Sequence, residues 1–78
     1  MKEYTNQEKL DIIINKLKQG NTTIRRIAND LNMNDLVLFS YISGYKETPD
    51  ILIKKIVETY NMNEEELYGV NMVKKLTI

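Results

Sequence analysis

The sequence predicts an all-α domain made of five short helices. Apolar residues recur three and four positions apart in successive segments, which is the spacing of a helix with one buried face. Thr and Asn residues suited to capping a helix start stand before these segments, and Gly or Asn residues suited to ending a helix stand after them. The chain has 78 residues, the length of one small domain, which we expect to occupy residues 1–69.

The first two helices are defined by their caps. Thr5 and Glu8 form the pattern of a capping box, and Gly20 is expected to end the first helix. Its buried stripe would consist of Leu10, Ile13, Ile14 and Leu17. Thr22 or Thr23 can cap the second helix. Its buried stripe would consist of Ile24, Ile27, Ala28 and Leu31.

The third helix follows the polar turn Asn-Met-Asn over residues 32–34. We expect Asn34 to cap this helix, with Asp35 in the first turn, where a negative charge suits the helix dipole. The helix is expected to run to Ser43 and to stop at Gly44 in a left-handed conformation.

The fourth helix is expected to begin with Thr48 as its cap and Pro49 in its first position. Its buried stripe would consist of Ile53, Ile56, Val57 and Tyr60. A second Asn-Met-Asn turn at residues 61–63 then leads into a short fifth helix with an acidic first turn, ending at Gly69. Residues 70–78 fit neither a strand nor a helix clearly, and we expect them to form a docking or dimerisation arm.

The composition excludes most kinds of catalytic and metal-binding site. Without cysteine or histidine the chain has no disulfide, thiol nucleophile or imidazole base, so we expect neither an enzyme nor a bound cofactor or metal. Eleven basic side chains balance eleven acidic ones, so any affinity for nucleic acid must come from a local patch. Apolar runs are short and no secretory signal opens the sequence, so we expect a cytoplasmic protein with no membrane contact.

Three stretches, in order, carry a resemblance to a known family: IRRIANDL over residues 24–31, DLVLFSYISG over residues 35–44, and KETPDILIKKIVETYNMNEEEL over residues 46–67. Together they resemble the helix-turn-helix domains of phage Cro and lambda-type repressors, often called Xre-type regulators. The resemblance implies a compact five-helix lambda-repressor-like domain with a short C-terminal tail. It also implies a sequence-specific transcriptional regulator, a repressor of phage or mobile-element type, that binds double-stranded DNA.

In this family the outward face of the third helix lies in the major groove. Carrying the positions across places six residues at base edges and nearby phosphates: Asn34, Asp35, Leu36, Phe39, Ser40 and Ser43. None of them is basic, whereas most relatives carry Gln, Arg, Ser, Asn or Lys there. Leu36 and Phe39 offer only apolar contact, for instance to thymine methyl groups, so the recognised site is expected to lean towards A·T pairs.

Residues on neighbouring segments are expected to contact the phosphate backbone. These are Thr23, Arg25, Arg26, Tyr45 and Lys46, with Lys54 and Lys55 on the fourth helix. The alternative is that the basic residues form an ordinary solvated face, and Tyr45 could contact a partner in place of a phosphate. Because one short helix contacts few bases, the resemblance implies binding as a homodimer, with the C-terminal tail as the favoured dimer contact.

The apolar residues of the third helix allow a second interpretation. One face of that helix already belongs to the core, and a helix that is apolar nearly all round is usually buried. Leu36 and Phe39 could therefore contact a protein partner, as in an antirepressor or a partner of another regulator. Zero net charge and Asp35 favour a protein partner, whereas Arg25, Arg26 and Lys46 favour DNA.

Overall fold

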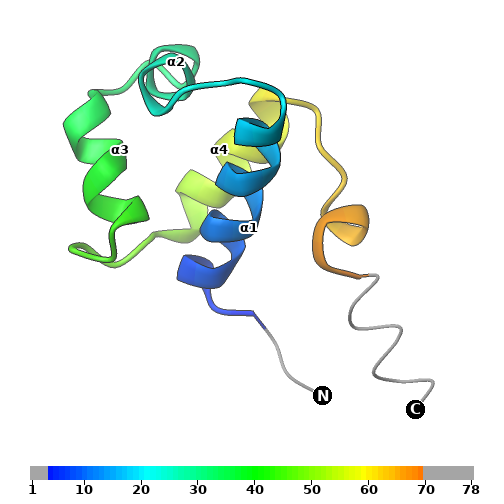
Figure 1. Ribbon diagram of the computed structural model, residues 1–78. Helices are drawn as coiled ribbons and strands as arrows, with labels where there is room; N and C mark the ends of the chain where they lie inside the picture. The colour runs from blue at the N-terminus through cyan, green and yellow to red at the C-terminus, as the bar shows by residue number, and fades with distance from the viewer. Residues whose placement is uncertain (1–3, 70–78) are drawn as a thin grey trace.

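A computed structural model describes residues 4–69 of the chain (Figure 1). Its elements are α1 (Asn6–Gln19), α2 (Ile24–Asp30), α3 (Asp35–Ile42), α4 (Asp50–Thr59) and the short η1 (Glu65–Gly69). No strand occurs in this part of the chain, which confirms the predicted all-α fold of five helices. The fifth is a single π-helical turn. Residues 70–78, predicted to form a docking or dimerisation arm, lie outside the described residues.

The predicted caps form at the first three helices. Thr5 Oγ1 accepts from the Glu8 amide at 3.2 Å while the Thr5 amide donates to Glu8 Oε1 at 2.9 Å, which completes the capping box. Thr23, rather than Thr22, caps α2. Asn34 caps α3 through its side-chain oxygen.

The predicted cap of α4 is wrong. Pro49, not Thr48, occupies the N-cap position, and no side chain caps this helix. Pro49 has an extended backbone, so the first helical residue is Asp50, and the Thr48 side chain is buried with its hydroxyl unpaired. Instead, the side-chain nitrogen of Asn6, on α1, donates to the Thr48 carbonyl at 3.1 Å and to Asp50 Oδ1 at 2.6 Å.

Three helices are each followed by an asparagine whose left-handed backbone conformation ends the helix. Asn21, Asn32 and Asn61 have φ values of 65°, 56° and 50°. In each case the next amide donates to a carbonyl five residues earlier, as in a Schellman motif: Thr22 to Leu17, Met33 to Ala28, and Met62 to Val57. Gly20 keeps φ at −90°, so the left-handed residue after α1 is Asn21. The two Asn-Met-Asn segments therefore form the same turn twice.

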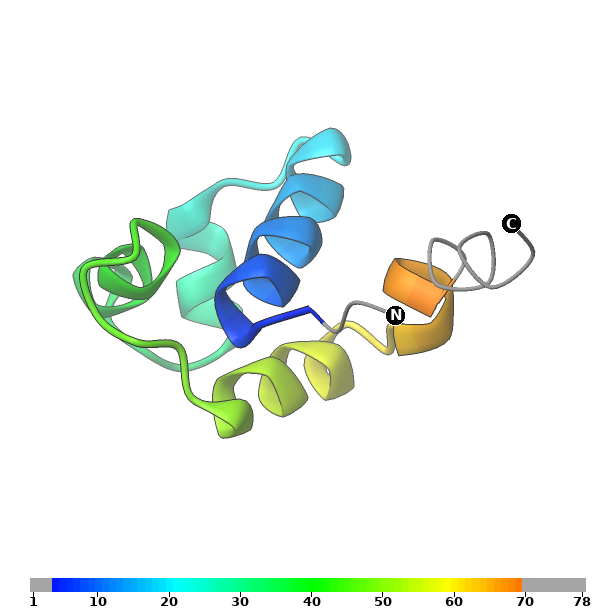
Figure 2. The same cartoon turned by 90° about the horizontal axis from the view of Figure 1, so that it is seen from below.

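The core lies between α1 and the remaining helices. Figure 2 shows α1 and α4 side by side, and α1 also packs against α3 and η1. The buried side chains include the predicted residues of α1, α2 and α4: Leu10, Ile13, Ile14, Ile27, Ala28, Leu31, Ile53 and Ile56. Ala28 is almost fully buried where α2 meets α3, so a small side chain suits their close approach. No helix in residues 4–69 is long and apolar enough to cross a membrane.

Candidate nucleic-acid interface

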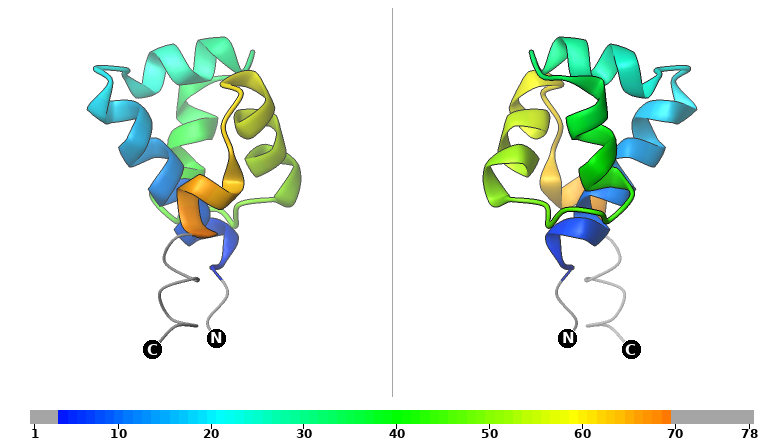
Figure 3. Two further views of the ribbon diagram at one scale, coloured as in Figure 1. Left: turned by 90° about the vertical axis from the view of Figure 1, so that its right-hand side faces the viewer. Right: turned by 90° about the vertical axis from the view of Figure 1, so that its left-hand side faces the viewer.

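Helix α3 lies at the surface of the domain. The right-hand view of Figure 3 shows α3 in front, α2 crossing above it and the loop to α4 passing below. Leu38 is fully buried on its inner side. Leu36 and Phe39 are 74% and 53% exposed, so they are not part of the monomer core. Helix α3 therefore has one apolar side in the core and another side that exposes two large apolar side chains to solvent.

Six residues define what we call the α3 outer face. They are Asn34, Asp35, Leu36, Phe39, Ser40 and Ser43, the residues predicted to read bases. The last four follow a spacing of three, four and seven residues, which places them along one side of the helix. The partly exposed Val37 borders this side.

Three polar side chains of the α3 outer face, those of Asn34, Ser40 and Ser43, make hydrogen bonds to their own helix. Asn34 Oδ1 accepts from the Leu36 amide at 2.7 Å as the helix cap. The Ser40 hydroxyl donates to the Val37 carbonyl at 2.6 Å, and the Ser43 hydroxyl donates to the Ser40 carbonyl at 3.3 Å. Both hydroxyls therefore use their single proton within the helix.

Arg25 reaches across from α2 to the start of α3. Its Nε lies 3.7 Å from Asp35 Oδ2, and the Arg25 side chain is 87% exposed. An exposed ion pair of this length adds little stability. It does place a cation beside the one acidic residue of the α3 outer face, so the two charges compensate each other.

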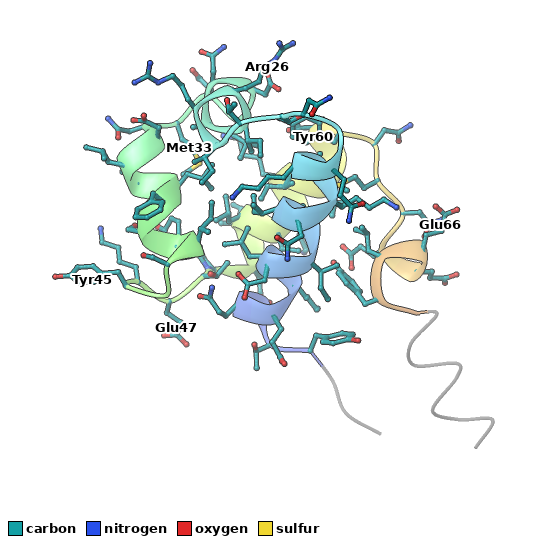
Figure 4. All side chains as sticks on the ribbon, viewed as in Figure 1. Arg26, Met33, Tyr45, Glu47, Tyr60 and Glu66 are labelled. Carbon is teal, nitrogen blue, oxygen red and sulfur yellow. The ribbon has the colours of Figure 1, made fainter. Side chains whose placement is uncertain are left out.

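Arg26 has different neighbours from Arg25. Figure 4 shows Arg26 at the top of the domain, on the same side as Tyr60. The Tyr60 hydroxyl donates to Asp30 Oδ2 at 2.6 Å and so links the ends of α4 and α2. The pKa of Tyr60 is raised to about 12, first by burial and then by the hydrogen bond and negative charge of Asp30, while the Arg26 charge opposes the rise. Arg26 thus faces the junction of α2 and α4, and Thr23 is used as the α2 cap.

The loop after α3 carries Tyr45 and Lys46. Gly44 adopts a left-handed φ of 81°, as predicted, and the Lys46 amide donates to the Ser40 carbonyl at 3.0 Å. Tyr45 is 88% exposed and projects away from the domain (Figure 4). Lys46 is also exposed and borders a pocket between the loop and the start of α1. The loop therefore presents an aromatic and a basic side chain at the end of α3.

Two residues of α1 position this loop, and no pattern in the sequence indicates their role. Gln7 Nε2 donates to the carbonyl of Ile42, the last residue of α3, at 3.1 Å. Asn6 holds the other end of the loop through its bonds to Thr48 and Asp50. Asn and Gln are ordinary residues for the first turn of a helix. Their hydrogen bonds to the loop depend on how α1 crosses it, which the local sequence does not reveal.

The structure therefore brings together only part of the predicted set. The α3 outer face has Arg25 at its N-terminal end and Tyr45 and Lys46 in the loop beyond its C-terminal end. Arg26 faces the junction of α2 and α4, and Lys54 and Lys55 are exposed on α4. No family model, curated protein or solved structure matches this chain.

Proposed function

We propose that this chain is a DNA-binding transcriptional regulator, a repressor of phage or mobile-element type, that inserts α3 into the major groove. The observation that carries the proposal is the exposed outer side of α3, held against α2 by a short turn. This arrangement matches the way a recognition helix is presented in helix-turn-helix proteins.

Phosphate contacts would come from the segments that flank α3. Arg25 and Lys46 are exposed near its two ends, and Tyr45 adds a hydroxyl. Thr23 caps α2 and Arg26 faces the junction of α2 and α4, so these two predicted contacts are not part of this group. Since the net charge of the chain is zero, this local group must supply the attraction. About four phosphate contacts would give a slope of about −4 in a plot of log K against log salt concentration.

Binding as a homodimer follows from the size of the recognition element. Helix α3 has 8 residues and can contact only a few base pairs. Two copies on half-sites about one helical turn apart would double that contact and give useful selectivity.

Fluorescence anisotropy with an AT-rich duplex across a salt series tests the proposal. We expect tight binding that weakens steeply with salt, and a shallower slope for the Arg25→Ala, Lys46→Ala double variant. Lys16→Ala is the matched control, because Lys16 lies beside Asn61 and Glu66 on the η1 side of the domain. Binding no stronger than millimolar at low salt would contradict DNA binding.

A protein-binding role is the second candidate. The apolar side chains of Leu36 and Phe39, with Tyr45 beyond them, favour it, because no cation stands on α3 itself. The helix-turn-helix scaffold would then act as an antirepressor or as the partner of another regulator. Loss of a protein complex in the Leu36→Ala, Phe39→Ala variant, with no salt-sensitive DNA binding in the unmodified protein, would favour this role.

A further inference from the structure

We propose, resting on the DNA binding proposed above, that the α3 outer face reads the C5-methyl groups of pyrimidines in the major groove. Its ligand chemistry is the methyl group shared by thymine and 5-methylcytosine and absent from cytosine and uracil. Sequence preference would then come from apolar contact, and hydrogen bonds to base edges would contribute little.

The hydrogen bonds of α3 support this assignment. Guanine offers only acceptors in the major groove, and adenine offers an acceptor beside its amino group, so both are normally read by side-chain donors. The hydroxyl protons of Ser40 and Ser43 are donated to carbonyls of their own helix. Asp35 has no proton to donate at neutral pH and lies beside Arg25. Among the six side chains of the α3 outer face, the Asn34 side-chain nitrogen is the one donor without a hydrogen bond to the helix, so a base would have to compete with a helix carbonyl for either serine proton.

The apolar side chains, in contrast, have no contact that removes them from solvent. Leu36 is 74% exposed and Phe39 is 53% exposed, and they stand three residues apart on one side of the helix. A methyl group at the edge of a pyrimidine projects into the major groove, where it can be buried against such side chains. Burial of each methyl group would strengthen binding about fourfold, corresponding to about 0.8 kcal/mol.

The charges near α3 favour DNA over an apolar partner for this surface. Arg25 stands near its N-terminal end and Lys46 follows its C-terminal end, and both side chains are exposed. An apolar strip whose one acidic residue is compensated by Arg25, with the cation of Lys46 beyond its other end, suits a groove whose two walls are phosphate backbones and whose floor carries methyl groups.

The test compares duplexes that differ only in methyl groups. The tightest duplex selected from a randomised pool is resynthesised with deoxyuridine in place of thymidine, and a second pair carries either cytosine or 5-methylcytosine at one contacted position. We expect affinity to fall about fourfold for each contacted thymine methyl removed, and to rise about fourfold when the cytosine is methylated. The Leu36→Ala, Phe39→Ala variant should bind the members of each pair equally. Because both residues are exposed, this variant should keep its fold, which circular dichroism checks.

Each other outcome overturns a specific statement. Equal affinity for the thymine and uracil duplexes would overturn methyl reading and leave DNA binding intact. A thymine preference that persists in the Leu36→Ala, Phe39→Ala variant would place the reading elsewhere and also overturn it. Absence of any salt-sensitive binding would overturn the proposed function and the inference with it. Lys46→Ala should weaken binding to all duplexes equally, which separates phosphate contact from methyl contact.

Discussion

Arg25 of α2 lies beside Asp35 of α3, with 3.7 Å between Nε and Oδ2. Asp35 is the one residue of the α3 outer face that phosphates would repel, and Arg25 stands where it can offset that repulsion. The same contact holds Arg25 at the start of α3. The pair therefore sets the charge that DNA would meet at the turn between α2 and α3, although it adds little stability.

Replacing Asp35 with Asn should increase affinity for DNA. The change removes a negative charge near the phosphates and releases Arg25, so we expect about fivefold tighter binding and a salt slope about 0.9 steeper. Stability should fall by less than about 1 kcal/mol, because a first-turn carboxylate is lost from α3. Anisotropy titrations measure the effect. Glu66→Gln is the control, since Glu66 lies on the opposite side of the domain (Figure 4), and equal gains in both variants would contradict a local role for Asp35.

Replacing Gln7 with Ala should loosen the loop after α3. The variant loses the 3.1 Å bond to the Ile42 carbonyl, so we expect a decrease of about 1 kcal/mol in the free energy of unfolding. Hydrogen exchange should accelerate at the Lys46 amide, which is bonded to Ser40. Gln19→Ala, at the exposed end of α1, is the control. Unchanged exchange at Lys46 would show that Gln7 does not hold the loop.

The left-handed turn between α2 and α3 should tolerate glycine but not alanine. Asn32 has φ of 56°, a conformation that costs an L-residue with a Cβ about 1–2 kcal/mol, although asparagine offsets part of this. We expect Asn32→Ala to be clearly less stable in urea unfolding than Asn32→Gly. The same comparison at Asn61, with φ of 50°, should give the same order. If alanine and glycine behave alike at both positions, the turn is not held in this conformation.

Tyr60 should make stability depend on alkaline pH. The pKa of Tyr60 is raised from 10.0 to about 12 by burial first and then by Asp30, so folding favours the neutral phenol. Its contribution to stability is therefore complete below about pH 10 and is lost as the pH rises through 12. Tyr60→Phe should be less stable at neutral pH, because it loses the bond to Asp30, and should show a weaker decline above pH 10. Urea unfolding of the unmodified protein and of Tyr60→Phe at neutral pH and above pH 10 checks this. Parallel declines of stability with pH in the two proteins would contradict it.

Much of the fold could be predicted because helix caps and stops depend on residues only a few positions apart. The Thr5–Glu8 capping box and the left-handed Gly44 follow from the side chains at those positions alone. Thr48 shows where such local reasoning fails. Its sequence context suits a cap, but Pro49 takes the cap position and the Thr48 side chain is buried instead.

The candidate site could be predicted less completely, because it depends on how helices cross. The exposure of Leu36 and Phe39 follows from helical spacing, given that Leu38 belongs to the core. The Arg25–Asp35 pair and the Gln7 bond to Ile42 join residues 10 and 35 positions apart, so they needed the three-dimensional arrangement. Arg25 and Arg26 are adjacent in sequence, yet the structure directs them to different neighbours.

The most direct measurement of the central claim is a map of amide chemical shifts during titration with an AT-rich duplex at low salt. If α3 enters the groove, the largest changes should fall on residues 34–46 and on the start of α2, while η1 changes little. Changes confined to η1 and the exposed side of α4, or no change at all, would contradict the assignment of α3 as the DNA-binding element.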